Sequence, residues 1–179
     1  VLRTAGVAAL PSRLAGTSAD AAAAGIMTTD TVAKVAEAPI GDGPAHVVGI
    51  AKGVGMIEPD MATMIAVVLT DAAVATAELD AAFRRVVERT FNCVSVDTDT
   101  STSDTAVVLA SGAAGPVGAA AFESALGEVC LSLTKQIAAD GEGATRLIEV
   151  TVDTAATPSQ AKRVAKAIVN SPLVKTAVH

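Results

Sequence analysis

The sequence predicts an α/β fold in which helices pack against the layers of a mixed sheet. Segments with helical periodicity alternate with short apolar segments typical of strands. Hydrophobic residues make up 51% of the 179 residues and aromatic residues only 2%. The core must therefore consist mainly of Ala, Val, Leu and Ile, which suit closely packed layers of helices on a sheet. The length is sufficient for one sizeable core or two small ones.

The N-terminal part of the chain is rich in alanine and predicts one helix and two strands. The helix covers residues 18–27, and the polar residues that follow end it. A Gly-Asp-Gly-Pro turn at residues 41–44 precedes a strand over residues 46–50. A second strand covers residues 63–70, and its continuous apolar character predicts burial on both faces.

Three further helices follow from apolar residues at helical spacing. The first begins with Thr76 as the N-cap and buries Leu79, Ala82, Phe83, Val86 and Val87. The second buries Phe122, Leu126, Val129, Leu133 and Ile137, and ends before residues 140–143. The third begins at Pro158, directs Ala161, Val164, Ala165 and Ile168 inward, and ends at Ser171-Pro172. Short strands are predicted over residues 93–96, 106–110 and 147–152.

Charge and cysteine content exclude several classes of function. The formal net charge is −6 and the pI is about 4.8, which argues against a surface for nucleic acid or for an anionic membrane. Cys93 and Cys130 lie in apolar patterns, so we expect buried free thiols. No Cys/His spacing resembles a zinc site, and no apolar segment reaches transmembrane length or resembles a signal peptide. We therefore expect a cytoplasmic protein without a bound metal.

The segment that carries most chemical information is the loop over residues 52–61, which precedes Thr63. It is rich in glycine, contains a proline, and brings a hydroxyl to the start of a predicted buried strand. This arrangement suits an enzyme that cuts its own backbone and then uses the new N-terminal threonine, because the free α-amine is a base beside the hydroxyl nucleophile. The alternative is an ordinary loop before a strand that happens to begin with a good strand former.

Four other candidates each have a structural alternative. Lys52 could assist a nearby α-amine or could be a solvated surface lysine. Glu142, between two glycines, suits a carboxylate that receives a substrate ammonium, but residues 140–143 could also form a helix C-terminal turn. The polar residues 97–105 fail the EF-hand pattern because Thr102 stands where glycine is required, which favours a turn-rich loop. His46 could join a Ser-His-Asp arrangement, with little support from spacing.

Five segments in order resemble the ornithine acetyltransferase family, also called glutamate N-acetyltransferase or the ArgJ family. They are residues 26–31 (IMTTDT), 52–64 (KGVGMIEPDMATM), 99–105 (DTSTSDT), 139–145 (ADGEGAT) and 171–177 (SPLVKTA). The resemblance implies an N-terminal-nucleophile architecture and cleavage between Ala62 and Thr63. Residues 1–62 would then end an α chain, and residues 63–179 would begin a β chain. Because a Thr-Gly oxyanion pair and a C-terminal substrate segment are not found in the sequence, the resemblance implies a central fragment of such a protein.

The resemblance also implies a reaction and a site. The acetyl group would move from N2-acetylornithine to glutamate, through an acetyl ester on Thr63, in arginine biosynthesis. Thr28, Lys52, Thr63 and Glu142 would line the substrate site. No cofactor or metal is implied; some members also use acetyl-CoA as donor. The expected partners are small-molecule substrates and the α and β chains of one precursor, assembled in a homo-oligomer.

Two alternatives to this function remain open at the level of the sequence. An N-terminal-nucleophile amidohydrolase or aminopeptidase would share the cleavage and the nucleophile but pass the acyl group to water. An inactive structural fragment would share neither. The partition of the acyl group between glutamate and water distinguishes the first alternative from the acetyltransferase.

Overall fold

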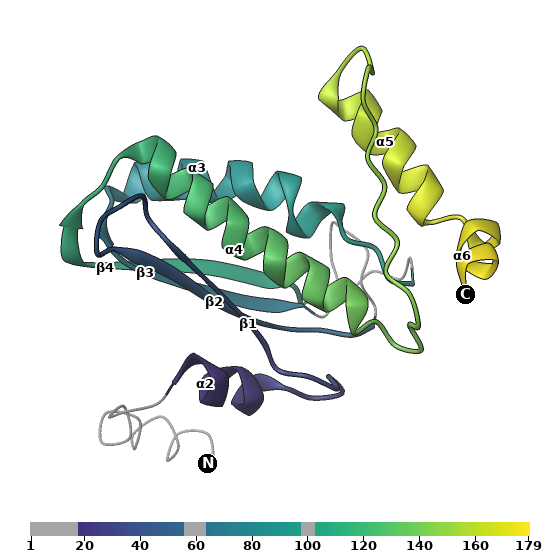
Figure 1. Cartoon of the computed structure of the whole chain (residues 1–179), viewed down its shortest axis with the longest axis horizontal. Helices are drawn as coiled ribbons and strands as arrows, with labels where there is room; N and C mark the ends of the chain where they lie inside the picture. Colours follow the sequence, from purple (N-terminus) through teal and green to yellow (C-terminus); the bar gives the residue numbers. More distant parts are fainter. Residues whose placement is uncertain (1–17, 56–63, 98–102) are drawn as a thin grey trace.

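A four-stranded sheet with two long helices on one face forms the centre of the fold (Figure 1). The computed structural model describes residues 18–55, 64–97 and 103–179. The strands lie side by side in chain order: β1 (Lys34–Pro39), β2 (His46–Lys52), β3 (Ile65–Ala73) and β4 (Thr105–Pro116). β2 is antiparallel to both β1 and β3, whereas β3 and β4 are parallel. The predicted α/β class with a mixed sheet is confirmed.

Helices lie on both sides of this sheet, and two more follow at the C-terminal end of the chain. They are α2 (Ala19–Ile26), α3 (Thr76–Arg89), α4 (Ala119–Ala139), α5 (Pro158–Val169) and α6 (Pro172–Val178), with a 3-10 turn η1 (Phe91–Cys93) after α3. α3 belongs to the crossover that the parallel pair β3–β4 requires. In Figure 1, α3 and α4 lie on one side of the sheet and α2 lies on the other.

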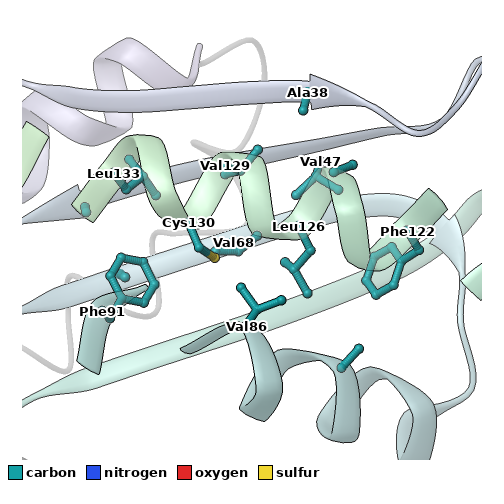
Figure 2. Close-up of a cluster of buried hydrophobic side chains, with 14 of the residues drawn as sticks. Ala38, Val47, Val68, Val86, Phe91, Phe122, Leu126, Val129, Cys130 and Leu133 are labelled. Carbon is teal, nitrogen blue, oxygen red and sulfur yellow. The ribbon is translucent and has the colours of Figure 1, made fainter. Parts of the chain in front are cut away.

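The core lies between the sheet and α4 and has few aromatic side chains (Figure 2). Val47 and Val68 extend from the sheet towards Leu126, Val129 and Leu133 of α4, and all five are fully buried. The helix lies close to the sheet at Gly49. An added Cβ there would lie 2.7 Å from Val129 Cγ1 and 2.8 Å from Leu133 Cδ1. The absence of a side chain at Gly49 therefore sets how tightly α4 packs.

The prediction that the strand over residues 63–70 is buried on both faces is wrong for the part that the structure describes. Burial along β3 alternates instead of being continuous. Ile65 and Leu69 remain 37% and 48% exposed, and Leu109, the partner of Leu69 on β4, is 56% exposed. The reason is that α3 and α4 both lie on the opposite face of the sheet.

Two predicted strands are also wrong. Residues 93–96 contain the end of η1 and an irregular segment, because the chain turns directly after α3. Residues 147–152 have strong strand propensity but are not assigned to a strand or to the four-stranded sheet. Cys93 lies in η1 and is exposed, so its predicted burial is wrong, whereas Cys130 is buried as predicted.

The helices agree better with the sequence, with three differences. Ala75, not Thr76, is the N-cap of α3. The predicted inward face of α5 is not buried, since Val164 and Ile168 are 44% and 37% exposed. Ser171-Pro172 ends α5 as predicted but also begins the short helix α6, with the Ser171 hydroxyl as its N-cap acceptor. The sequence analysis missed both α6 and β1.

Candidate functional site

Three segments from distant parts of the chain meet at the end of the sheet where β2 finishes. They are residues 28–31 before β1, residues 52–55 from the last residue of β2 onward, and residues 140–143 after α4. Each of them carries one residue of the predicted substrate site: Thr28, Lys52 or Glu142. The structure therefore brings together the three described members of that set.

Lys52 and Thr28 are in direct contact. Lys52 Nζ donates a hydrogen bond of 3.2 Å to Thr28 Oγ1. The Lys52 residue is only 7% exposed, so the interpretation of Lys52 as a solvated surface lysine is wrong. Thr28 is exposed, so the pair is accessible from solvent on the Thr28 side. No carboxylate lies within ion-pair distance of Lys52 among the residues that the structure describes.

Glu142 lies beside the segment that follows Lys52. Its backbone N–H donates a 2.7 Å hydrogen bond to Val54 O, while its side chain is exposed. A Cβ added at Gly55 would lie 3.1 Å from Glu142 Oε2 and 3.6 Å from Asp97 Oδ2. Two carboxylates therefore flank Gly55. The turn interpretation of residues 140–143 also holds, because Asp140 is the C-cap of α4 and Gly143 has a φ of 74°.

Asp97 is a member of this site that the sequence analysis assigned only to a turn-rich loop. Its position at the start of the polar segment 97–105 was the available signal, but nothing in the spacing related it to Gly55 or Glu142. Its proximity to Gly55 depends on how the chain returns from α3 towards the end of α4.

Ala62 and Thr63, the predicted cleavage site, lie outside the described residues. The structure does describe the next residue, Met64, which is 7% exposed. Met64 N donates a 2.6 Å hydrogen bond to Asp104 Oδ1, and Met64 O accepts one of 2.9 Å from Thr105 N. The chain directly after Thr63 is thus fixed to the start of β4.

The buried ammonium group of Lys34 lies next to the segments that form the site. Lys34, the first residue of β1, has a fully buried side chain, and its Nζ lies 2.8 Å from Asp30 Oδ1 and 2.5 Å from Asp140 Oδ2. Asp30 also accepts hydrogen bonds from the backbone N–H groups of Gly53 at 2.7 Å and Thr28 at 3.2 Å. The sequence analysis missed this cluster, because Lys34 and Asp140 are 106 positions apart.

Both aspartates of the cluster have lowered pKa values. Burial alone would raise the pKa of Asp30, but the hydrogen bonds from Lys34, Gly53 and Thr28 outweigh it and hold the pKa below its ordinary value of 3.8. The same balance holds for Asp140, where burial is outweighed by the bonds from Lys34 and Thr31. Both carboxyl groups are therefore ionised near neutral pH.

Comparison with known proteins assigns the chain to a family. The model of the ArgJ family matches residues 3–179. The chain belongs to the ArgJ family. It is 60% identical over 175 residues to arginine biosynthesis bifunctional protein ArgJ 2 of Nostoc sp., covering 98% of this chain and 45% of that protein. It is 61% identical over 160 residues to glutamate N-acetyltransferase Oat2 of Streptomyces clavuligerus, covering 89% of this chain and 40% of that protein.

A solved structure supports the same assignment. The crystal structure of arginine biosynthesis bifunctional protein ArgJ from Bacillus halodurans is similar with a TM-score of 0.61 and 48% sequence identity. The similarity covers 63% of this chain and 56% of the solved chain. This ArgJ-family chain thus spans less than half the length of the two curated relatives above.

The remaining candidates in the ArgJ-family chain do not form a second site. Burial raises the pKa of Cys130 to about 12, so this thiol is not a nucleophile near neutral pH. His46 is at the opposite end of β2 from Lys52, with its Nδ1 2.7 Å from Pro44 O. Within residues 18–55, 64–97 and 103–179, no His, Cys, Asp and Glu side chains form a group suited to a metal ion. Nor is any helix in those ranges long and apolar enough to cross a bilayer.

Proposed function

We propose that the protein containing these residues transfers an acetyl group from N2-acetylornithine to glutamate in arginine biosynthesis. Membership of the ArgJ family supports this reaction, as does the similarity to a glutamate N-acetyltransferase. The observation that carries the proposal is the contact of the buried Lys52 ammonium with the Thr28 hydroxyl, beside the turn that holds Glu142. The three residues offer a cation, a hydroxyl and a carboxylate, and a carboxylate suits the ammonium group of the proposed substrate.

The nucleophile in this proposal is Thr63, released by cleavage of the Ala62–Thr63 peptide bond. Residues 1–62 then end the α chain, and residues 63–179 begin the β chain. The Thr63 oxygen attacks the acetyl carbonyl of acetylornithine, while the α-amine of Thr63 accepts the hydroxyl proton. Ornithine leaves with that proton on its nitrogen, and an acetyl ester remains on Thr63. The amine of glutamate then attacks the ester, which restores the threonine hydroxyl.

Each of the three described residues has a distinct role in this reaction. The Lys52 cation favours the neutral, basic form of the nearby α-amine. Thr28 accepts a hydrogen bond from Lys52 and so fixes the direction of its ammonium group. Glu142 receives the δ-ammonium of acetylornithine, because its carboxylate is exposed and its backbone is held by Val54.

The wider setting is part of the same proposal. The substrates are small molecules, with acetyl-CoA as a possible second donor to be tested beside acetylornithine. The α and β chains derive from one precursor, assemble into a homo-oligomer and act in the cytoplasm. The reaction as written needs no cofactor, because the acetyl ester on Thr63 carries the group between the two amines.

Acetylornithine with a labelled acetyl group tests this proposal on the full-length protein. We expect mass spectrometry to find the label on the fragment that begins at Thr63, and glutamate to discharge it as labelled acetylglutamate. Discharge to water as free acetate, at the same rate with and without glutamate, would favour an amidohydrolase. An uncleaved protein that never acquires the label would indicate an inactive protein.

A further inference from the structure

We infer that Lys34, Asp30 and Asp140 form a positioning centre that fixes the relative geometry of Thr28, Lys52 and Glu142. This inference rests on the proposed function, since it assigns a purpose to the site that the three segments create. None of the three charged residues of the centre is placed against substrate. Asp30 and Asp140 act through backbone N–H groups of the site segments, and Lys34 acts through these two carboxylates.

The hydrogen-bonding capacity of the Lys34 ammonium is fully used inside the protein. Its Nζ lies 2.8 Å from Asp30 Oδ1, 2.5 Å from Asp140 Oδ2 and 3.4 Å from Val32 O. An ammonium group has three donors, so none is left for substrate. The Lys34 and Asp30 side chains are both 0% exposed, and that of Asp140 is 4% exposed. The centre is therefore closed to solvent and to ligands.

Asp30 joins two of the site segments. Its Oδ1 accepts a 2.7 Å hydrogen bond from the N–H of Gly53, the residue directly after Lys52. Its Oδ2 accepts one of 3.2 Å from the N–H of Thr28. A single carboxylate therefore holds the backbone of Thr28 and of Gly53, the residue next to Lys52, and so connects the two segments whose side chains form the Lys52–Thr28 contact. Gly53 has a φ of 146°, so this bond also fixes the direction in which the chain leaves β2.

Asp140 joins the third segment to the first. It accepts a 3.1 Å hydrogen bond from Thr31 N and a further bond from the Thr31 hydroxyl. It is also the C-cap of α4, two residues before Glu142. The end of α4 is thus linked to the segment that carries Thr28 directly, through Thr31, and also through the Lys34 ammonium that Asp140 shares with Asp30.

The centre is charged because it supplies directional hydrogen bonds, and not because it adds stability to the fold. Burying an ion pair is costly in desolvation, and well-packed apolar residues often stabilise a fold as well or better. An apolar cluster would not, however, hold the backbone N–H groups of Gly53 and Thr28 at defined angles. The centre therefore contributes geometry to the site in a way that ordinary core residues do not.

The test compares Asp30→Asn with a core variant that lowers stability without touching the three segments. Asn keeps the shape of Asp, but its NH₂ group would face one of the two backbone N–H groups, of Gly53 and Thr28, that donate hydrogen bonds to Asp30. Val86→Ala, or Leu126→Ala if that matches better, provides the control with an equal fall in Tm; both residues are fully buried. All variants are made in the full-length protein, which is assayed for acetyl transfer and for amide hydrogen exchange.

We expect Asp30→Asn to lower kcat/KM for acetyl transfer at least about ten-fold relative to the Tm-matched control, because misplaced site residues stabilise the transition state less well. We also expect faster hydrogen exchange at Gly53 and Thr28 in Asp30→Asn alone. Asp140→Asn should instead raise KM for acetylornithine, because it loosens the segment of Glu142. Equal kcat/KM and equal exchange in Asp30→Asn and the control would overturn the inference.

The exchange measurement separates this inference from the proposed function. If the wild-type protein transfers no acetyl group, the proposed reaction fails, but unchanged protection of Gly53 and Thr28 in Asp30→Asn would still overturn the positioning role. If Asp30→Asn does not fold, Asp140→Asn and its KM effect decide the question. An unchanged KM in a folded Asp140→Asn protein then counts against the centre.

Discussion

Lys52, the last residue of β2, donates a 3.2 Å hydrogen bond to Thr28, which lies 24 positions away in the segment between α2 and β1. One end of this contact is buried and the other is exposed. The Lys52 ammonium therefore lies close to solvent without being fully hydrated.

Thr63→Ala should abolish self-cleavage, because it removes the hydroxyl that attacks the carbonyl of Ala62. Thr63→Ser should still be cut, since the hydroxyl is retained. Intact mass and N-terminal sequencing of the purified protein measure both outcomes. The same two fragments in Thr63→Ala would place the nucleophile at another residue.

Lys52→Met should lower turnover with little change in Tm. Because Lys52 is 7% exposed, Met fills nearly the same buried space and removes the charge together with the hydrogen bond to Thr28. The α-amine of Thr63, with an ordinary pKa of about 7.7–8.0, would then be protonated at higher pH than in wild type. Turnover measured against pH should therefore rise later than in wild type.

The matched control for this charge is Lys135→Met. Lys135 forms a surface ion pair with Glu149 at 2.9 Å, so its loss should leave turnover unchanged. If Lys52→Met unfolds the protein but the folded fraction turns over normally, the role of Lys52 is structural.

Glu142→Gln should weaken binding of acetylornithine by roughly ten- to a hundred-fold, because a hydrogen bond to a charged group contributes about 1.5–3 kcal/mol. An analogue whose δ-nitrogen carries no charge should be almost unaffected. Calorimetry or KM values with both substrates give the comparison. Asp80→Asn, which removes an exposed carboxylate paired with Arg84, serves as the control. Equal losses for both substrates would mean that Glu142 does not recognise that charge.

The Lys34 cluster should make the protein sensitive to acid. The pKa values of Asp30 and Asp140 are lowered from 3.8 in the folded protein, so the unfolded chain binds protons first as the pH falls. Their contribution to the free energy of unfolding is therefore complete well above pH 3.8 and is lost as the pH drops through the lower folded-state values.

Urea unfolding of an Asp30→Asn/Asp140→Asn double variant measures this contribution. We expect lower stability than wild type at neutral pH but a shallower decline in acid. Some decline should remain, because hydrogen bonds from Lys162 and Arg85 also lower the pKa values of Glu88 and Glu123. A decline as steep as that of wild type would show that the two aspartates are not the acid-sensitive groups.

Gly49→Ala should destabilise the fold by about 1–3 kcal/mol, because the new methyl group would overlap Val129 and Leu133 of α4. Gly25→Ala, in α2, meets nothing within 4 Å and should be neutral or stabilise the helix by about 0.5 kcal/mol. Thermal unfolding of the two variants gives the contrast. A Gly49→Ala protein as stable as wild type would mean that α4 can move away from the sheet at little cost.

Local patterns predicted the elements whose burial repeats along the chain. α4 buries Phe122, Leu126, Val129, Leu133 and Ile137, as their spacing indicates. The prediction of a strand over residues 147–152 was wrong, because strand propensity produces a strand only where the edge of another strand is available for pairing. β1 was missed because Lys34, Glu37 and Pro39 are poor strand signals.

The candidate site divides in the same way. Lys52 and Glu142 were candidates from the residues themselves, Thr28 was added by the family resemblance, and the described structure brings all three to one end of the sheet. Lys34 could not be selected, since burial of a lysine is rare and depends on partners brought in by the fold. Asp97 could not be selected because its proximity to Gly55 also depends on the fold. For Lys34 the distant partner is Asp140, at the far end of a helix that follows the whole sheet.

The pairing of β2 with β3 has a consequence for how the mature protein refolds. β2 precedes residues 62 and 63, β3 follows them, and the ladder between the strands extends from Val47–Thr70 to Lys52–Ile65. Cleavage at that bond would make this ladder a contact between two polypeptides within one sheet. Folding of the precursor is unimolecular, but recovery of the cut form after denaturation would then be second order. Dilution would slow that recovery, although it leaves precursor folding unaffected.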